Sequence, residues 1–516
     1  MMLKEILNGC EYSERLPGDQ TGSQKDISGI AYDSRDVREG YLFVAIKGEK
    51  FDGHDFIRKA VENGAAAIVC EHTPSECGTR DTEMNPPVSC IHVKDSRKAL
   101  ACIANNFYER PSEALTLIGI TGTNGKTTTT YILKSILETW GRNVGLIGTI
   151  RYMIKDRIYP AIHTTPESPE FQGLLKEMLL SGCTHIISEV SSHALAQHRV
   201  DHIAFDTAVF TNLTRDHLDF HKTMEEYFIA KQRLFQELLD NDGTAVINLD
   251  DPYGMKLISL LRPLKNRKIL TYGITGKADI TADNVAVSFE GLRFQISFKG
   301  KQFDVTSPLI GKPNVYNILS AAGAACSLHI PWKVMLESIA KTGSITGRFE
   351  KLQSGQRFLC LIDYAHTEDA LERLILTARE ILGKSQIVAR NTSSRIITVF
   401  GCGGDRDKGK RPGMGEIATR LSDIVIITSD NPRSEEPEDI IRDIEEGAVR
   451  KNYLIEPDRR TAIHTAVEMA DKGDIVLIAG KGHEDYQEIK SARYRFSDRD
   501  VLRDAINIRL KAHDVQ

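Results

Sequence analysis

The sequence has no apolar run of membrane-spanning length and no apolar signal-peptide core near its start, which predicts a cytoplasmic protein without membrane insertion. It has no basic excess, since 66 lysines and arginines stand against 71 acidic residues, so a nucleic-acid partner is not expected. Its nine cysteines form no C-x-x-C pair, which predicts reduced thiols instead of a disulfide framework or a zinc site. Internal repeats and low-complexity tracts are also absent.

The length of 516 residues is too great for one hydrophobic core and predicts about three domains. Short apolar runs such as AAAIVC (65–70) and THIIS (184–188) alternate with helix-like patterns along the chain. This alternation predicts α/β domains whose mostly parallel sheets are covered by helices. We expect a small α/β domain over residues 1–112, a central domain over 113–345 and a Rossmann-like domain over 346–516.

A phosphate-binding loop is indicated by GITGTNGKTTTT at residues 119–130, between an apolar run and a helix-like run. Its glycines let backbone N–H groups point at phosphate oxygens, Lys126 suits the outer phosphates, and the Thr127 hydroxyl suits Mg²⁺. Ile120 stands where the general pattern has glycine, so this is a variant loop. The central domain is therefore expected to be a P-loop ATPase domain.

Three polar residues lie downstream of this loop. Glu189 comes directly after THIIS, His217 follows the run DTAVFTNL, and Lys231 lies in the next helix-like stretch. Ligands of open α/β sheets bind beyond the carboxyl ends of strands, and Mg²⁺ on ATP takes one or two carboxylates. Each residue alone is more typical of a surface glutamate, a capping histidine or a solvated lysine. Together, after a phosphate loop, they favour a metal–nucleotide site.

The order of short motifs resembles the Mur ligase family. The motifs are TGTNGKTTT, TTPE (164–167), EVSSHALAQHRV, NLTRDHLDFH, AKQRLF, GKPNVYNILSAAGAA, GRFE, DYAHT, GCGGDRDKGKRP, DNPR (430–433) and GKGHE (480–484), and they run through nearly the whole chain. The family itself uses the variant phosphate loop. Glu368 replaces the proline that usually follows DYAHT, and because glutamate is tolerated in a first helical turn, no functional change is expected.

The resemblance implies a ligase that uses ATP and Mg²⁺, with catalytic roles for Lys126, His217 and Lys231. Carboxylation of Lys231 by CO₂ would turn a cation that repels the metal into a carbamate that binds it. The implied metal ligands are Thr127, Glu189, His217 and the Lys231 carbamate. The implied ATP contacts, which lie between the second and third domains, are Gly122, Thr123, Asn124, Gly125, Lys126, Thr127, Thr128, Asn314, Asn317, Arg348 and Asp363.

The resemblance also implies two further substrates for a ligase of peptidoglycan precursor synthesis. The nucleotide sugar UDP-N-acetylmuramoyl-L-alanyl-D-glutamate would be held by Ser34, Thr164, Thr165, Ser191, Gln197 and Arg199. Ordinary turn and loop chemistry explains Ser34 and the threonine pair about equally well. The second substrate, meso-diaminopimelate, would be held by Arg406, Asp430, Asn431, Pro432, Arg433, Gly480 and Glu484.

Two alternative functions are a mechanical or switch ATPase and the same ligase with L-lysine as its added amino acid. A mechanical or switch ATPase would have no use for DNPR and GCGGDRDKGKRP. The same ligase with L-lysine as the added amino acid differs only by one carboxylate, which Arg433 could hold with two parallel hydrogen bonds. In the family DNPR marks the diaminopimelate users, so diaminopimelate is the expected substrate. A monomer is the expected oligomeric state.

Overall fold

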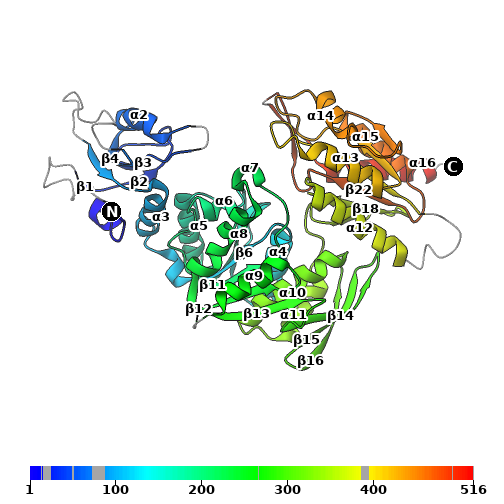
Figure 1. The fold of residues 1–516 in the computed structure, drawn as a ribbon, viewed down its shortest axis with the longest axis horizontal. Coiled ribbons are helices and arrows are strands. Elements are labelled where there is room, and N and C mark those ends of the chain that lie inside the picture. The colour runs from blue at the N-terminus through cyan, green and yellow to red at the C-terminus, as the bar shows by residue number, and fades with distance from the viewer. Residues whose placement is uncertain are drawn as a thin grey trace.

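The computed structural model has three bodies that follow one another along the chain (Figure 1), drawn in blue, in cyan to green and in yellow to red. The residues that it describes are 1–12, 14–15, 25–48, 51–72, 88–264, 267–384, 394–490 and 492–514. Each body has its own sheet flanked by helices, which confirms the predicted α/β class. Within the described part of the chain, no helix is long and apolar enough to cross a membrane.

The N-terminal sheet has the strand order β1-β5-β4-β3-β2 and is parallel except for β1, which runs antiparallel to β5. Its strands are β1 (Glu14–Arg15), β2 (Gly29–Ala31), β3 (Tyr41–Val44), β4 (Ala65–Cys70) and β5 (Ser89–His92). The flanking helices are α1 (Leu3–Ile6), α2 (Ile57–Glu62) and α3 (Ser96–Phe107). Asp95 begins α3, because its carboxylate accepts the free N–H groups of Arg97 and Lys98.

Cys10 and Cys102 form a disulfide, so the expectation of reduced thiols is wrong for these two residues. Their Cα atoms lie 5.8 Å apart although 92 positions separate them in the chain. The pairing arises because α3 packs against α1, where Asn106 Nδ2 donates to the Ile6 carbonyl at 2.9 Å. Free thiols remain at Cys183, Cys326, Cys360 and Cys402.

The central sheet has the order β16-β15-β14-β13-β12-β11-β6-β10-β7-β8-β9. The strands from β14 to β7 in this order are parallel and the outer ones are antiparallel, as expected for a mostly parallel sheet. The strands are β6 (Thr116–Thr121), β7 (Val144–Ile147), β8 (Arg151–Ile154), β9 (Arg157–Pro160), β10 (His185–Glu189), β11 (Phe205–Phe210), β12 (Leu239–Asn248), β13 (Lys268–Gly273), β14 (Ile280–Val287), β15 (Leu292–Phe298) and β16 (Lys301–Ser307). Neighbours β10, β6 and β11 thus bring three functional loops to one edge.

Helices cover this sheet along buried apolar faces. In α4 the buried residues Ile132, Leu133, Ile136 and Leu137 recur at the spacing of one helical face. The helices are α4 (Lys126–Thr139), α5 (Ser168–Leu180), α6 (Ser192–Ala196), α7 (Leu218–His221), α8 (Met224–Arg233), α9 (Pro252–Leu261), α10 (Lys312–Ser327) and α11 (Trp332–Lys341).

The C-terminal sheet has the order β17-β18-β22-β19-β20-β21 and is parallel except for β17. Its strands are β17 (Glu350–Leu352), β18 (Leu359–Asp363), β19 (Ile396–Phe400), β20 (Ile424–Ile427), β21 (Tyr453–Ile455) and β22 (Ile475–Ala479), followed by a hairpin of β23 (Tyr486–Ile489) and β24 (Ala492–Arg495). The helices are α12 (Glu368–Lys384), α13 (Lys410–Leu421), α14 (Pro437–Glu445), α15 (Arg459–Met469) and α16 (Asp498–Asp514). Glu368 begins α12, as expected from its tolerance in a first turn.

Candidate active site

The phosphate loop joins β6 to α4. Gly122 has a φ of 144°, and a Cβ atom at this position would lie 1.9 Å from Thr211 Oγ1, so only glycine fits. Lys126 starts α4 and donates to the carbonyl oxygens of Gly122 and Thr123, both at 2.9 Å. The N-terminus of α4, which favours anions, faces the same loop. The predicted phosphate residues, Gly122 to Thr128, therefore form one continuous cradle.

Glu189, at the end of β10, lies beside this cradle with a buried side chain. Its Oε2 accepts from the hydroxyls of Thr127 and Thr149, both at 2.9 Å, and its Oε1 accepts the Thr149 N–H at 2.9 Å. Carboxylate and hydroxyl oxygens are the ligands that Mg²⁺ prefers, so this donor set fits the implied metal. The sequence reasoning missed Thr149, whose hydroxyl also lies 3.1 Å from that of Thr164. The position of Thr149 just after β7 is the feature of the sequence that could have identified it as a site residue.

His217 and Lys231 lie around the same loop. His217 is partly exposed, and burial lowers its pKa to about 4, so the imidazole is neutral, the form that binds metals. Lys231 is buried on α8, and its Nζ donates to the Gly122 carbonyl at 3.0 Å. Burial, and secondly the nearby Lys126, hold the pKa of Lys231 well below its usual value. Within the described residues, no hydrogen bond joins either side chain to Glu189.

A cavity of about 650 Å³ lies between the central and C-terminal bodies. Asn317 Nδ2 donates to Asn314 Oδ1 at 2.9 Å on α10, and Asp363 at the end of β18 accepts the Phe349 N–H at 2.6 Å. The predicted ATP residues that line this cavity are Asn124, Gly125, Thr128, Asn314, Asn317, Arg348 and Asp363. Arg373 of α12 also lines it and was not predicted. Residues from two domains thus meet around one space.

Four of the residues predicted for the nucleotide sugar form one group. Thr165 Oγ1 donates to the Glu189 carbonyl at 2.7 Å and accepts the Ser191 N–H at 3.0 Å. Arg199 donates to the Thr165 carbonyl at 3.0 Å and to Gln197 Oε1 at 2.6 Å. The group therefore lies directly beside Glu189, the residue whose carboxylate is on the metal side of the loop.

Ser34 lies in the N-terminal body, and in the described ranges no hydrogen bond joins it to this group. Glu167, the last residue of TTPE, makes one link between the two bodies, because it pairs with Arg199 at 2.9 Å and with Arg97 of α3 at 3.5 Å. A second link is the hydrogen bond from Tyr32, two residues before Ser34, to Glu170 at 3.0 Å. TTPE is one of the motifs that resemble the family, but Glu167 was not among the predicted site residues.

A second cavity, of about 630 Å³, has one wall from the central body and one from the C-terminal body. His217 belongs to the first wall. The predicted diaminopimelate residues on the second wall are Arg406, Asp430, Asn431, Arg433, Gly480 and Glu484. Pro432 is not in this lining, and its carbonyl faces Gly404, where a Cβ atom would meet it at 1.9 Å.

Hydrogen bonds hold the charged side chains of the second wall in defined positions. Asn431 Nδ2 donates to Glu484 Oε2 at 2.8 Å, and the buried Lys481 donates to Asn431 Oδ1 at 3.0 Å and to Glu484 at 3.2 Å. Burial raises the pKa of Glu484, and Lys481 opposes this shift. Arg433 Nη1 donates to the Gly404 carbonyl at 2.7 Å. The sequence reasoning did not include Lys481, although GKGHE contains it.

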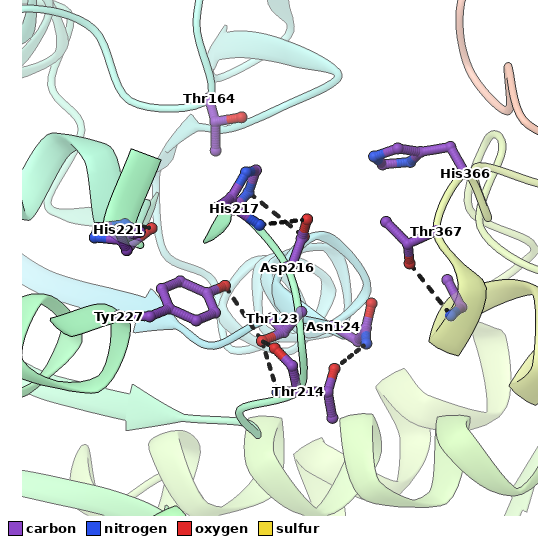
Figure 2. Close-up of polar contacts among 12 residues, drawn as sticks. Thr123, Asn124, Thr164, Thr214, Asp216, His217, His221, Tyr227, His366 and Thr367 are labelled. Atoms are coloured by element: carbon purple, nitrogen blue, oxygen red, sulfur yellow. Dashed lines mark hydrogen bonds and ion pairs between the residues drawn. The ribbon is translucent and has the colours of Figure 1, made fainter. Parts of the chain in front are cut away.

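His366 of DYAHT also lines the second cavity and was given no role. Figure 2 shows its ring facing the space opposite His217 and Asp216. Its Nδ1 lies 2.8 Å from the Tyr364 carbonyl, which requires a proton on Nδ1 and leaves the Nε2 lone pair free to accept one. Burial, and secondly Lys410, lower the pKa of His366, so the ring is neutral near pH 7.

A cluster of Asp52, His54 and His72 in the N-terminal body has the residue types of a metal site. However, His54 Nε2 accepts the Glu71 N–H at 2.9 Å while Nδ1 lies 2.5 Å from Asp52 Oδ1. A metal on Nδ1 would place a proton on Nε2, facing another N–H donor. The hydrogen bonds therefore favour a structural histidine.

Comparison with known proteins agrees with this geometry. Three family models match the chain: "Mur ligase family, catalytic domain" over residues 26–108, "Mur ligase middle domain" over 120–325 and "Mur ligase, glutamate ligase domain" over 347–482. A solved UDP-N-acetylmuramoyl-L-alanyl-D-glutamate–2,6-diaminopimelate ligase has a TM-score of 0.67 and 33% identity, with 99% of each chain covered. A MurF ligase from Thermotoga maritima in complex with ADP, at 20% identity and a TM-score of 0.59, shares the fold, with 96% of this chain and 99% of that one covered.

Curated relatives extend over nearly the whole length. The UDP-N-acetylmuramoyl-L-alanyl-D-glutamate–2,6-diaminopimelate ligase of Solibacter usitatus is 44% identical over 510 residues, which covers 98% of each chain. The ligase of the same name from Aquifex aeolicus is 44% identical over 487 residues, with 93% of this chain and 94% of that one covered. On these matches, this chain belongs to the Mur ligase family.

Proposed function

We propose that this protein is the ATP-dependent ligase that joins meso-diaminopimelate to the D-glutamate of UDP-N-acetylmuramoyl-L-alanyl-D-glutamate, in peptidoglycan precursor synthesis. The observation that carries the proposal is the second cavity, in which His217 of the phosphate side faces Arg406, Arg433 and Glu484. Two guanidinium groups and one carboxylate suit a substrate with two carboxylates and a free ammonium. The names of the curated relatives support the same reaction.

The first chemical step activates a carboxylate, because a carboxylate oxygen is too poor a leaving group to be displaced by an amine. The γ-carboxylate of the D-glutamate attacks the γ-phosphorus of ATP, and the bond from that phosphorus to the oxygen bridging it to the β-phosphate breaks. The products of this step are an acyl phosphate and ADP, which is the leaving group. Lys126 and the N–H groups of the phosphate loop stabilise the charge of the transferring phosphoryl group. Asn314, Asn317, Arg348 and Asp363 would hold the rest of the nucleotide in the first cavity.

Mg²⁺ would fit beside the loop, where Thr127 and Glu189 would supply oxygen ligands and neutral His217 would supply a nitrogen ligand. Carboxylated Lys231 would add further oxygens. When bound, the metal supplies positive charge next to the phosphates. Thr149 keeps the Glu189 carboxylate oriented toward the loop through two hydrogen bonds from its N–H and hydroxyl.

The second chemical step needs an unprotonated amine. The lone pair of the diaminopimelate amine attacks the acyl carbon, and the tetrahedral intermediate expels phosphate. His366 is placed to take the proton of that amine at Nε2, because it lines the cavity that also contains Arg433 and Glu484. Holding amine and acyl phosphate together supplies much of the remaining rate advantage.

The decisive test offers diaminopimelate and L-lysine in parallel, with ATP and the nucleotide sugar, and follows release of ADP and phosphate. We expect release to require both the nucleotide sugar and diaminopimelate. Turnover with lysine at a comparable kcat/KM would favour the lysine-adding alternative. Release that needs neither co-substrate would instead favour a simple ATPase.

We propose domain boundaries near residues 112 and 345, which lie between β5 and β6 and between β16 and β17. We also propose that the enzyme is cytoplasmic and monomeric; one chain supplies both walls of each cavity, which supports the monomer.

A further inference from the structure

One carboxylate joins the two loops that carry Arg406 and Arg433. Glu435 lies two residues after DNPR, and its Oε1 accepts from Arg411 Nη2 at 2.9 Å and from the Asp405 N–H at 2.7 Å. Its Oε2 accepts from Arg411 Nη1 at 3.0 Å and lies 2.9 Å from Lys408 Nζ. Every one of these donors belongs to GCGGDRDKGKRP. Both oxygens of Glu435 are thus bound by the neighbouring loop.

Arg411 is the buried half of this connection. Its side chain is 0% exposed, and besides Glu435 it contacts Asp443 Oδ2 at 2.7 Å and the Gly403 carbonyl at 3.3 Å. A buried guanidinium that loses a partner becomes costly, because its charge has left water. The hydrogen bonds from Arg411 are the main reason that the pKa of Glu435 is lowered to about 2. Glu435 and Arg411 are therefore both charged near neutral pH.

Further contacts hold the two loops in a single arrangement. Ser434 Oγ donates to Asp405 Oδ1 at 2.6 Å, and the Gly404 N–H donates to the Asn431 carbonyl at 2.9 Å. Arg433 has a left-handed φ of 53°, which an arginine rarely adopts unless its surroundings require it, whereas Asp405, with a φ of 52°, is a residue type that tolerates this conformation. The arrangement of the loops is therefore imposed by these contacts.

Arg406 and Arg433 depend on that arrangement in different ways. Arg433 is anchored to the Gly404 carbonyl at 2.7 Å. Arg406 is exposed, and it makes no hydrogen bond or ion pair to any part of the chain that the structure describes. Its position over the cavity is thus set only by the backbone of its loop. Bidentate recognition of a carboxylate tolerates displacements of about 0.5 Å.

We infer that Glu435 is a positioning residue that sets the spacing between Arg406 and Arg433, and thereby the preference for an amino acid with two carboxylates. The inference rests on the proposed function and adds a residue that contacts no substrate. A looser arrangement of the two loops should weaken binding of the distal carboxylate of diaminopimelate more than it weakens the other interactions of this substrate. Lysine, which lacks that carboxylate, should be affected far less.

The test compares Glu435→Gln with Asp443→Asn in steady-state assays with diaminopimelate and with lysine. Both variants remove a charged partner of Arg411, but Asp443 lies on α14 and, unlike Glu435, does not connect the loop of Arg406 to the loop of Arg433. For Glu435→Gln we expect KM for diaminopimelate to rise by about tenfold or more, the kcat/KM preference over lysine to fall by a similar factor, and KM for ATP to stay within about twofold. Asp443→Asn should match the wild type in its KM for diaminopimelate, its kcat/KM preference over lysine and its KM for ATP.

An unchanged preference in Glu435→Gln, or an equal change in Asp443→Asn, would overturn the inference. Should Glu435→Gln not fold, as judged by thermal unfolding, Ser434→Ala decides, because it removes only an exposed hydrogen bond to Asp405. That variant should lower the preference by about threefold, and no change would count against the inference. A wild-type enzyme that does not use diaminopimelate would refute the proposed function instead.

Discussion

Lys126 and Lys231 donate to the same carbonyl oxygen, that of Gly122, at 2.9 and 3.0 Å. Two ammonium groups on one acceptor repel each other, and burial lowers the pKa of both. A neutral amine is the form that reacts with CO₂. A carbamate at Lys231 would replace this repulsion by attraction to Lys126 and would add oxygens beside the metal side of the loop.

Lys126→Ala should lower kcat by about 10³-fold or more, because it removes the charge that stabilises the transferring phosphoryl group. Binding of the nucleotide sugar, measured by calorimetry, should change little, since the hydrogen bonds that Lys126 donates within the described residues go to its own loop. Lys134→Ala, on the same helix but paired with Glu138, is the matched control and should retain activity. An equal loss of activity and of nucleotide-sugar binding in Lys126→Ala would indicate that Lys126 has a structural role.

Lys231→Ala should be nearly inactive, because it removes the amine that carries the carbamate. Added formate or acetate should restore part of the rate by supplying an oxygen ligand in its place. Intact-mass spectrometry under CO₂, with and without chemical trapping, should find the modification on Lys231 in the wild type. Near-normal activity of Lys231→Ala would show that the assignment from the family is wrong here.

Arg433→Ala should lose most activity with diaminopimelate while ATP binding is unchanged, because Arg433 lines the second cavity and is not among the residues that line the first. In the wild type, a site built around the second carboxylate should reject lysine by a factor of roughly 10⁴. Competition assays with both amino acids measure this factor. Arg442→Ala, at an exposed position of α14, is the control. A wild type that uses both amino acids equally would contradict this role of Arg433.

His366→Asn should lower kcat by about 10²-fold, because the amine would then lose the proton acceptor at Nε2 of His366. A base works only when neutral, so the wild-type rate should fall as the pH drops through the pKa of His366. Since burial lowers that pKa, the fall should lie below the ordinary histidine value of about 6.5. The variant should lack this limb in a pH profile of kcat.

Hydroxylamine trapping should still detect the acyl phosphate in His366→Asn, because the histidine acts after phosphoryl transfer. His329→Asn is the control, since His329 is exposed and has a left-handed backbone that asparagine tolerates. Persistence of the acidic limb in His366→Asn would assign it to another group.

Local sequence determined most of the elements and the order of the motifs. The run AAAIVC forms β4 over the same residues, and THIIS forms the main part of β10. Such elements follow from short-range patterns, because the apolar faces of strands and helices are set by neighbouring residues. The glycines and lysine of the phosphate loop are likewise contiguous in the chain, so their proximity needed no knowledge of the fold.

Only the tertiary structure decided which distant residues meet. Cys10 pairs with Cys102 across 92 positions, and Glu435 binds Arg411 across the gap between two loops. His366 faces His217 only because two domains share a cavity. Such contacts depend on how whole sheets and helices pack, and no local periodicity records that packing. Glu435, which acts by holding other residues in place, could therefore be identified only after the loops around it had been placed in space.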